Sequence, residues 1–273
     1  MSTALARTSP VTRPHPMAPF GLLVEVDGRQ ADIRDLSAEQ IRQWVAEHRV
    51  VVLRGLPVFS SKEEMAAYCA TWGELLEWNF GTVLELVVHD QPKNYLFTHG
   101  NVPFHWDGAF ARATPRFMFF QCVKAPLEGS GGETTFCDTS RVWASLTPEQ
   151  RERWSRVTIT YATQKLAHYG GEVTVPLVGK HPLTGATALR FAEELNEESV
   201  PLNPLFLHIQ GLPSEQHPAL LAELRQTLYH PEHCLMHPWR DGDILICDNH
   251  ALLHGRQPFH EGSPRHLRRV HIL

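Results

Sequence analysis

The chain has 273 residues, of which 42% are hydrophobic and 20% charged, and its formal net charge is −5. This composition is typical of a globular protein with one large domain or two small ones. No apolar run approaches the ~20 residues that a membrane helix needs, and no broad basic face of the nucleic-acid-binding kind is present. We therefore expect a protein that acts on a small molecule, without a nucleic acid or membrane partner. The composition is compatible with a homo-oligomer.

Two features of the chain bear on its compartment and domain organisation. Five scattered cysteines without C-x-x-C spacing are typical of reduced thiols in a cytoplasmic protein. The first 19 residues are rich in Pro, Ser and Thr and lack the apolar block of a signal peptide. We therefore expect a flexible N-terminal tail over residues 1–19 and a single domain over residues 20–273.

The beginning of this domain alternates strands and helices. Loose alternation predicts a strand over residues 20–26, and a β-branched run predicts another over residues 50–53. Ser37 and Ser61 each begin a capping-box pattern, which predicts the start of a helix. The two helices are expected over residues 37–47 and 61–73.

From residue 82 onward, short β-prone runs alternate with turn residues. Strands are expected over residues 83–88, 116–123, 133–137, 157–161, 173–178, 187–191, 244–247 and 267–272. Helices are expected over residues 139–146, from Thr147 onward, and over residues 214–229 within a helical insertion at about 196–236. Many short strands with turns between them predict a mainly β fold with flanking helices. Its core would be a double-stranded β-helix, the jelly roll of cupin-like proteins.

The hexapeptide at residues 103–108, Pro-Phe-His-Trp-Asp-Gly, contains a candidate metal site. Seventeen histidines and 30 acidic residues in 273 positions predict about two His-x-acid tripeptides by chance, and the chain has two. In a strand, His105 and Asp107 would converge on one point while Trp106 faces away. An imidazole and a carboxylate together suit an Fe(II) centre with open positions, whereas thiolate-rich sets suit structural zinc.

A third ligand is expected from a distant strand, because a facial triad needs a rigid neighbour for its third vertex. His254, soon after the expected buried strand over residues 244–247, fits this role best, and His250 is its main rival. The other His-x-acid tripeptide, His230 to Glu232, is disfavoured because its proline and its position at a helix end spoil strand geometry.

A set of motifs follows in one order along the chain. These are His105-x-Asp107, Gly131-Gly132-Glu133-Thr134, residues 239–243, Asp248-Asn249, His254, Arg265 and Arg269. In order and rough spacing they resemble the taurine dioxygenase-like (TauD/TfdA) family of Fe(II)/2-oxoglutarate oxygenases. The likeness covers roughly residues 20–273 and implies a dioxygenase, an oxidoreductase whose co-substrates are 2-oxoglutarate and O2.

The resemblance also implies roles for individual residues. The implied iron ligands are His105, Asp107 and His254. The residues implied for 2-oxoglutarate are Thr134, Arg265 and Arg269. Arg265 would hold the distal carboxylate in a bidentate contact, and Arg269 would lie near the iron, against the co-substrate or an anionic substrate group. Because related halogenases carry a small residue in place of Asp107, halogenation is disfavoured.

A narrower likeness concerns the substrate. Residues 104–110, 120–122 and 135–139 resemble the isonitrile-modifying members of the family. Those enzymes convert tyrosine isonitrile to vinyl isonitriles by desaturation or oxidative decarboxylation, in paerucumarin- and rhabduscin-type secondary metabolism. The candidate substrate-binding residues are Asn101, Phe104, Trp106, Phe110 and Arg269. Plain core packing suits the aromatic members of this set equally well.

Three alternatives stay open. The chain could be a TauD-like hydroxylase of another small anionic substrate, such as a sulfonate or an amino acid. It could be a non-catalytic jelly-roll binding protein, although the intact triad and Arg265 disfavour a decayed site. A zinc hydrolase with the same three ligands would leave Arg265 and Thr134 without a role.

Overall fold

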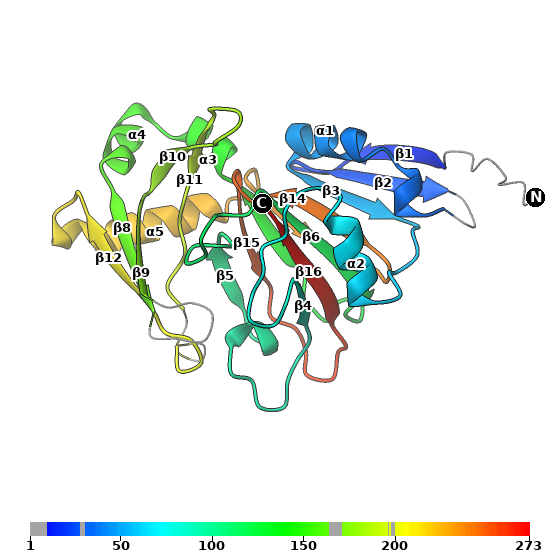
Figure 1. The fold of residues 1–273 in the computed structure, drawn as a ribbon. Helices are drawn as coiled ribbons and strands as arrows, with labels where there is room; N and C mark the ends of the chain where they lie inside the picture. The colour runs from blue at the N-terminus through cyan, green and yellow to red at the C-terminus, as the bar shows by residue number, and fades with distance from the viewer. Residues whose placement is uncertain (1–9, 28–30, 164–170, 196, 198–199) are drawn as a thin grey trace, which may run out of the picture.

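The computed structural model describes residues 10–27, 31–163, 171–195, 197 and 200–273. Two β-sheets pack against each other, and a further group of helices and strands lies at one end of the molecule (Figure 1). Within the described residues, no helix is long and apolar enough to cross a membrane. This arrangement confirms the expected class, mainly β with flanking helices.

The strands that carry the candidate site are divided between the two sheets. The larger sheet has seven strands in the order β1 (Val11–Pro16), β2 (Leu22–Asp27), β3 (Val50–Arg54), β14 (Ile244–Asp248), β6 (Phe117–Lys124), β16 (His266–Ile272) and β4 (Val83–Leu86). The smaller sheet has four strands in the order β13 (Cys234–His237), β7 (Thr134–Asp138), β15 (Leu252–Arg256) and β5 (Val102–His105). Only β2 and β3 pair in parallel within these two sheets. From β13 to β16 the chain alternates between the sheets.

Side chains at alternate positions fill the space between the two sheets. On β6, Phe120 lies in the cluster between the sheets, whereas Phe119 lies in the cluster on the outer face of the larger sheet. On β16, Leu267 is inward and Val270 outward. Because the side-chain period of a strand is two, positions 269 and 271 therefore also point between the sheets.

Two helices cover the outer face of the larger sheet (Figure 1). They are α1 (Ala38–His48) and α2 (Lys62–Cys69). The hydroxyl of Ser37 accepts a hydrogen bond from the Gln40 amide, and that of Ser61 accepts one from the Glu64 amide. Each helix therefore begins at the serine that the capping pattern predicts.

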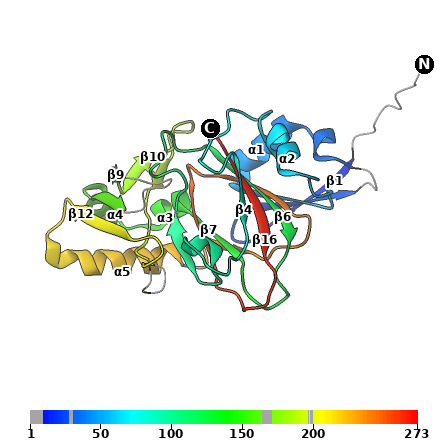
Figure 2. The same cartoon turned by 60° about the horizontal axis from the view of Figure 1, so that its bottom comes forward.

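The remaining elements pack on the outer face of the smaller sheet, at the opposite end from α1 and α2 (Figure 2). They are α3 (Thr139–Ser145), α4 (Pro148–Ser155), β8 (Thr158–Thr163), β9 (Gly171–Pro176), β10 (Val178–Lys180), β11 (Thr187–Leu189), β12 (Leu205–Gln210) and α5 (His217–Leu228). Short 3-10 turns occur at Ile33–Asp35, Tyr95–Phe97 and Ser214–Gln216. Leucines of α5 pack in one cluster with Phe104 of β5 and Leu253 of β15. This layer thus supports the strands that carry the candidate ligands.

Two expectations about the chain's organisation differ from the structure. Residues 11–16 of the expected tail form β1, which pairs with β2 at the edge of the larger sheet. Local sequence patterns did not predict this strand because it contains prolines. An edge strand tolerates proline because one row of its backbone amides needs no partner. Residues 1–9 lie outside the described part. The insertion over about 196–236 is not purely helical, since β12 precedes α5 and β13 begins within it.

A buried carboxylate ties this layer to β5. Glu193 accepts hydrogen bonds from the Phe104 amide at 2.9 Å and the Tyr229 hydroxyl at 2.6 Å, and its side chain is buried. Replacing Glu193 with Ala is expected to lower the free energy of unfolding by about 2–3 kcal/mol, because both donors lose their buried acceptor. Denaturant titration measures this change.

The matched control is Glu194→Ala, since Glu194 is the exposed neighbour. That variant is expected to stay within about 0.5 kcal/mol of the parent protein. Equal stabilities of the two variants would contradict the role assigned to Glu193.

Candidate metal centre

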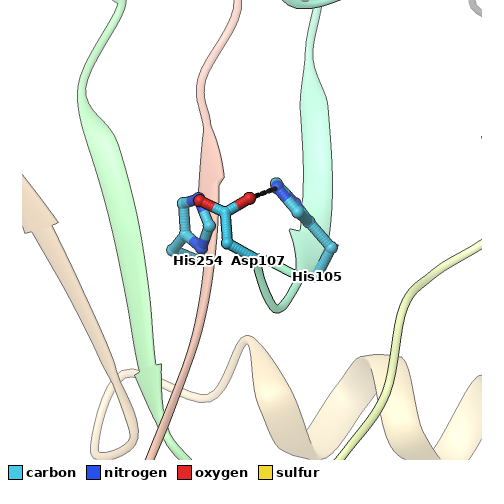
Figure 3. A group of neighbouring side chains, drawn as sticks. All are labelled: His105, Asp107 and His254. Atoms are coloured by element: carbon cyan, nitrogen blue, oxygen red, sulfur yellow. Dashed lines mark ion pairs between the residues drawn. The ribbon is translucent and has the colours of Figure 1, made fainter. Parts of the chain in front are cut away.

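His105, Asp107 and His254 come together between the two sheets (Figure 3). One potential ligand atom from each residue lies within 4.8 Å of the others. Nε2 of His105 lies 3.6 Å from Oδ1 of Asp107, and Nε2 of His254 lies 3.6 Å from Oδ2. The pairing of β5 with β15 places His254 directly opposite His105. The cross-strand register therefore brings together two side chains that are far apart in the sequence.

Asp107 does not lie on the strand that carries His105, contrary to the sequence-based expectation. Strand β5 ends at His105, and Asp107 lies in the turn that follows. Gly108 has a φ of +85°, and a Cβ at that position would lie 2.5 Å from Cδ of Pro115. Only glycine suits so tight a turn.

The side chain of Asn249 forms hydrogen bonds with the backbone of this turn. Its Oδ1 accepts a hydrogen bond from the Asp107 amide at 3.1 Å, and its Nδ2 donates to the Asp107 carbonyl at 3.0 Å. Nδ2 also donates to the carbonyl of Pro115 at 2.9 Å. The side chain of Asn249 is fully buried, and its single amide group links the backbone at Asp107 to the backbone at Pro115.

The histidines present the nitrogens that a metal needs. Nδ1 of His105 lies 2.9 Å from the carbonyl of Pro103, which can only accept, so Nδ1 carries the proton and Nε2 is left with its lone pair. Burial, together with the nearby His105, holds the pKa of His254 well below its ordinary value. Burial thus favours the neutral form of His254, the form in which imidazole binds a metal, and the Pro103 carbonyl turns Nε2 of His105 towards the site.

Asp107 is prepared as an anion. Burial alone would raise its pKa, but the guanidinium of Arg269 beside it holds that pKa well below its ordinary value. Two neutral imidazoles and one carboxylate on the same side of a site form the facial set that suits Fe(II) with open positions. The donor set of this structure therefore fits ferrous iron.

Two further residues contact the carboxylate of Asp107. Nη1 of Arg269 lies 2.7 Å from Oδ2, and Nε2 of His271 lies 2.8 Å from the same atom. Arg269 was expected near the metal, whereas His271 was not. Strand alternation could have found it, because His271 lies two residues after Arg269 on an expected strand.

A first cavity beside the triad has the character of an anion site. It is lined by Leu86, Leu96, Val102, His105, Phe120, Thr134, His254, Gly255, Arg256, Arg265 and Arg269. Nε of Arg265 donates to the carbonyl of Gly132 at 3.0 Å, and Nη2 lies 3.4 Å from the hydroxyl of Thr134. The same hydroxyl accepts a hydrogen bond from Nε1 of Trp239 at 2.9 Å.

Two of the three arginines that line this cavity, Arg256 and Arg265, have no carboxylate partner among the described residues, whereas Arg269 pairs with Asp107. Among the described residues, no carboxylate oxygen forms an ion pair with Arg265 or Arg256, and both side chains are buried. Burial lowers the pKa of Arg265 to about 9 and that of Arg256 to about 10. Buried charges are normally paired, so this cavity is suited to an anionic ligand such as a dicarboxylate.

A second cavity, which His105 and Arg269 also line, is mainly apolar. It is lined by Asn94, Tyr95, Leu96, His105, Trp106, Asp107, Gly108, Ala109, Phe110, Tyr161, Thr163, Ala192, Leu195, Asn203, Leu205 and Arg269. Trp106 packs edge-on against Tyr161, with ring centroids 5.4 Å apart. Arg269 lines both cavities, so its guanidinium lies at the boundary between them.

Two candidate substrate residues lie away from this cavity. Phe104 points to the outer side of β5 and packs against Tyr229, with ring centroids 4.3 Å apart, because it alternates with His105. Asn101 precedes β5 and is not among the lining residues. Of the five candidates, Trp106, Phe110 and Arg269 line the cavity.

The rival histidines also lie outside the triad. Nδ1 of His250 lies 3.1 Å from Nη2 of Arg190, and the His250 carbonyl accepts a hydrogen bond from the same guanidinium. His230 and Glu232 form an exposed pair 4.0 Å apart. Neither set belongs to the group of metal-ligating side chains found among the described residues.

A model of the Taurine catabolism dioxygenase TauD, TfdA family matches residues 12–271. The chain belongs to this family. It is 58% identical, over 94% of each chain, to the 3-((Z)-2-isocyanoethenyl)-1H-indole synthase of Fischerella ambigua. It is 39% identical to the tyrosine isonitrile desaturase of Pseudomonas aeruginosa, over 93% of this chain and 87% of that one.

The fold of this TauD/TfdA enzyme is also similar to solved structures. A crystal structure of PvcB from Pseudomonas aeruginosa matches with a TM-score of 0.81 and 35% identity, over 100% of this chain and 94% of that chain. A second PvcB structure, that of an Fe, alpha-ketoglutarate dependent oxygenase from an isonitrile synthetic pathway, matches with a TM-score of 0.80.

The TauD/TfdA enzyme is therefore a non-haem iron oxygenase that depends on Fe(II) and 2-oxoglutarate. These comparisons confirm the expected enzyme class and cofactors. They leave no support for the non-catalytic binding protein or the zinc hydrolase.

Replacing Arg265 with Ala is expected to weaken 2-oxoglutarate binding by at least about 30-fold. The reason is that unpairing a buried carboxylate costs about 2 kcal/mol or more. The dissociation constant is measured without oxygen, from the visible charge-transfer band of the Fe(II) enzyme titrated with 2-oxoglutarate.

Arg268→Ala is the matched control. Arg268 neighbours Arg269 on β16, but its guanidinium faces outward and bonds the Phe59 carbonyl and Glu85. This variant should bind 2-oxoglutarate as the parent enzyme does, and an equal loss in both variants would refute the specific role of Arg265.

Proposed function

We propose that this enzyme oxidises an isonitrile derived from an aromatic amino acid and forms a vinyl isonitrile by oxidative decarboxylation, in secondary metabolism. The observation that carries this proposal is the 58% identity, over 94% of each chain, to an enzyme named for an isocyanoethenyl-indole product. The cavity beside the triad supports it, because its wall is apolar and aromatic and one cation, Arg269, lies at its inner end.

The metal site is proposed to use His105, Asp107 and His254 as ligands. Arg265 and Thr134 are proposed to hold the distal carboxylate of 2-oxoglutarate, since a guanidinium beside a hydroxyl suits that group. Iron bound there, with 2-oxoglutarate and O2, supplies the oxidising power for removal of hydrogen from the substrate. The protein's own task is to place the substrate, keep water out and hold the ligands.

The aromatic part of the substrate is proposed to lie against Trp106, Phe110 and Tyr161. These rings offer the apolar, edge-on and stacking contacts that an aromatic side chain prefers. The substrate carboxylate would face Arg269. In that orientation the carbon that loses hydrogen lies on the metal side of the cavity.

The reaction balances with one molecule each of O2 and 2-oxoglutarate. The substrate loses its carboxyl group as CO2 and two hydrogen atoms, and a carbon–carbon double bond forms beside the isonitrile. 2-Oxoglutarate becomes succinate and CO2. The second oxygen atom leaves as water with the two hydrogens.

The ring of the substrate is proposed to be indole, with the phenol of tyrosine isonitrile as the second candidate. The identity of 58% to the relative named for an isocyanoethenyl-indole product exceeds the 39% to tyrosine isonitrile desaturases. Hydroxylation of a sulfonate or an amino acid is the remaining alternative within the family. It is disfavoured because the cavity wall is largely apolar.

Two broader features belong to the same proposal. The alternation of strands between the two sheets supports a double-stranded β-helix as the core architecture. All five cysteines are unpaired, which supports a reducing compartment such as the cytoplasm.

The proposed function is tested by incubating the Fe(II) enzyme with 2-oxoglutarate, O2 and the isonitrile of either tryptophan or tyrosine. Mass spectrometry is expected to show loss of CO2 and two hydrogens from the tryptophan derivative, with one succinate per product. Faster turnover of the tyrosine derivative would make phenol, rather than indole, the preferred ring of the substrate. Succinate release without conversion of either isonitrile would overturn the proposal.

Replacing Phe110 with Ala is expected to raise the KM for the isonitrile about tenfold, because the ring of the substrate loses an apolar contact worth more than 1 kcal/mol. The dissociation constant of 2-oxoglutarate should not change, since Phe110 lines only the second cavity. Phe206→Ala, which removes an exposed ring that lines neither cavity, serves as the control. An unchanged KM in the Phe110 variant would remove this residue from the substrate site.

A further inference from the structure

We propose that His271 and Trp78 position the carboxylate of Asp107, so that Oδ2 is held by the protein and Oδ1 is left for the metal. This inference rests on the proposed role of Asp107 as a metal ligand. It adds two positioning residues that act through Asp107 and lie outside the ligand set.

The contacts of the two carboxylate oxygens differ. Oδ2 lies 2.8 Å from Nε2 of His271 and 2.7 Å from Nη1 of Arg269. An ionised carboxylate oxygen offers about two lone-pair directions, so these two donors satisfy it. Oδ1 instead faces Nε2 of His105 at 3.6 Å, a nitrogen that carries a lone pair and cannot donate. Although His254 lies 3.6 Å from Oδ2, the donors on that atom make Oδ1 the available ligand.

Trp78 fixes which nitrogen of His271 carries the proton. Nε1 of Trp78 lies 3.2 Å from Nδ1 of His271, and an indole nitrogen can only donate. Nδ1 must therefore accept, and the ring proton is on Nε2, from which it donates to Asp107. A chain of two hydrogen bonds, from indole to imidazole to carboxylate, thus runs in one direction. Outer contacts of this kind orient the ligands of metal sites.

The fold holds this chain in place. His271 is buried on β16, and its carbonyl accepts a hydrogen bond from the Leu76 amide at 3.0 Å. The segment that carries Trp78 is thereby attached to His271 by its main chain as well as by its side chain. Movement of one residue would carry the other with it.

Arg269 cannot replace His271 in this role. Its guanidinium lines both cavities and is available to anionic groups in either one. His271 lines neither cavity, so its contact with Oδ2 does not compete with a bound ligand. We assign the charge that keeps Asp107 ionised to Arg269, and the orientation of the carboxylate to His271.

The test is titration of the apo-enzyme with Co(II) alone, at one fixed pH, with the dissociation constant and the visible Co(II) spectrum as readouts. His271→Leu is expected to weaken Co(II) binding about 10- to 100-fold and to change the spectrum, because Asp107 loses its fixed orientation. His271→Gln keeps an N–H donor near the position of Nε2 and should bind within about threefold of the parent enzyme.

Two more variants complete the series. Trp78→Phe removes the indole N–H and is expected to weaken Co(II) binding by a few-fold, less than His271→Leu. His266→Leu makes the same chemical change on the same strand, at a half-buried position beside Glu85, and should bind Co(II) as the parent enzyme does. Circular dichroism of each apo-variant shows whether it is folded.

Parent-like Co(II) affinity and spectrum in a folded His271→Leu variant would overturn the inference. If that variant does not fold, Trp78→Phe decides, and its parent-like binding would overturn the inference equally. The variant Asp107→Ala distinguishes failure of the positioning role from failure of the proposed metal site. The measurement needs no isonitrile, so it does not depend on the proposed substrate. If Asp107→Ala loses Co(II) binding while His271→Leu keeps it, the positioning role is refuted and Asp107 remains a ligand. If Asp107→Ala keeps Co(II) binding, Asp107 is not a ligand.

Discussion

The pairing of β15 with β5 is the constraint on which the rest of the site depends. It places His254 opposite His105 in the smaller sheet, so backbone hydrogen bonds set the distance between the two imidazoles. At Gly255 the strands approach so closely that a Cβ would lie 2.5 Å from the carbonyl of Val102. The remaining ligand, Asp107, lies in the turn after β5. Asn249, in the loop between β14 and β15, forms hydrogen bonds with the backbone of that turn. The metal site thus arises where β5 ends beside the middle of β15.

The strand opposite, β16, supplies the charge of the site. Arg269 and His271 point between the sheets because Leu267, in the same phase, does so, and Arg265 precedes the strand from the same side. The inner cluster otherwise consists of apolar side chains such as Phe120 and Phe136. Cations held in such surroundings interact strongly with bound anions, since little water screens them. The cavity proposed for 2-oxoglutarate therefore owes its electrostatic character to the same core that stabilises the fold.

Much of this could be predicted from the sequence, for physical reasons that are local. The serines that begin α1 and α2 bind amides within the same turn, and His105 and Asp107 lie only two residues apart in the sequence. Other features depend on contacts between distant residues. The edge strand β1 was not predicted because of its prolines, and Phe104 was assigned to the substrate site because the sequence does not show which side of β5 faces the cavity. The role of Asn249 follows only from tertiary contacts, and so does the hydrogen bond of His271 to Asp107. The turn at Asp107 was missed because Gly108 was not recognised as the end of the strand.

Part of the wall of the apolar cavity comes from a different part of the architecture than the metal site. Tyr161, Leu195 and Leu205 belong to the layer at the end of the molecule, whereas the ligand histidines and Arg265 belong to the two-sheet core or directly flank it. Substitutions in that outer layer can therefore alter the shape presented to an incoming ring without disturbing the oxidising centre. This separation offers a route by which one ancestral scaffold could diversify its choice of aromatic group while its chemistry stayed constant.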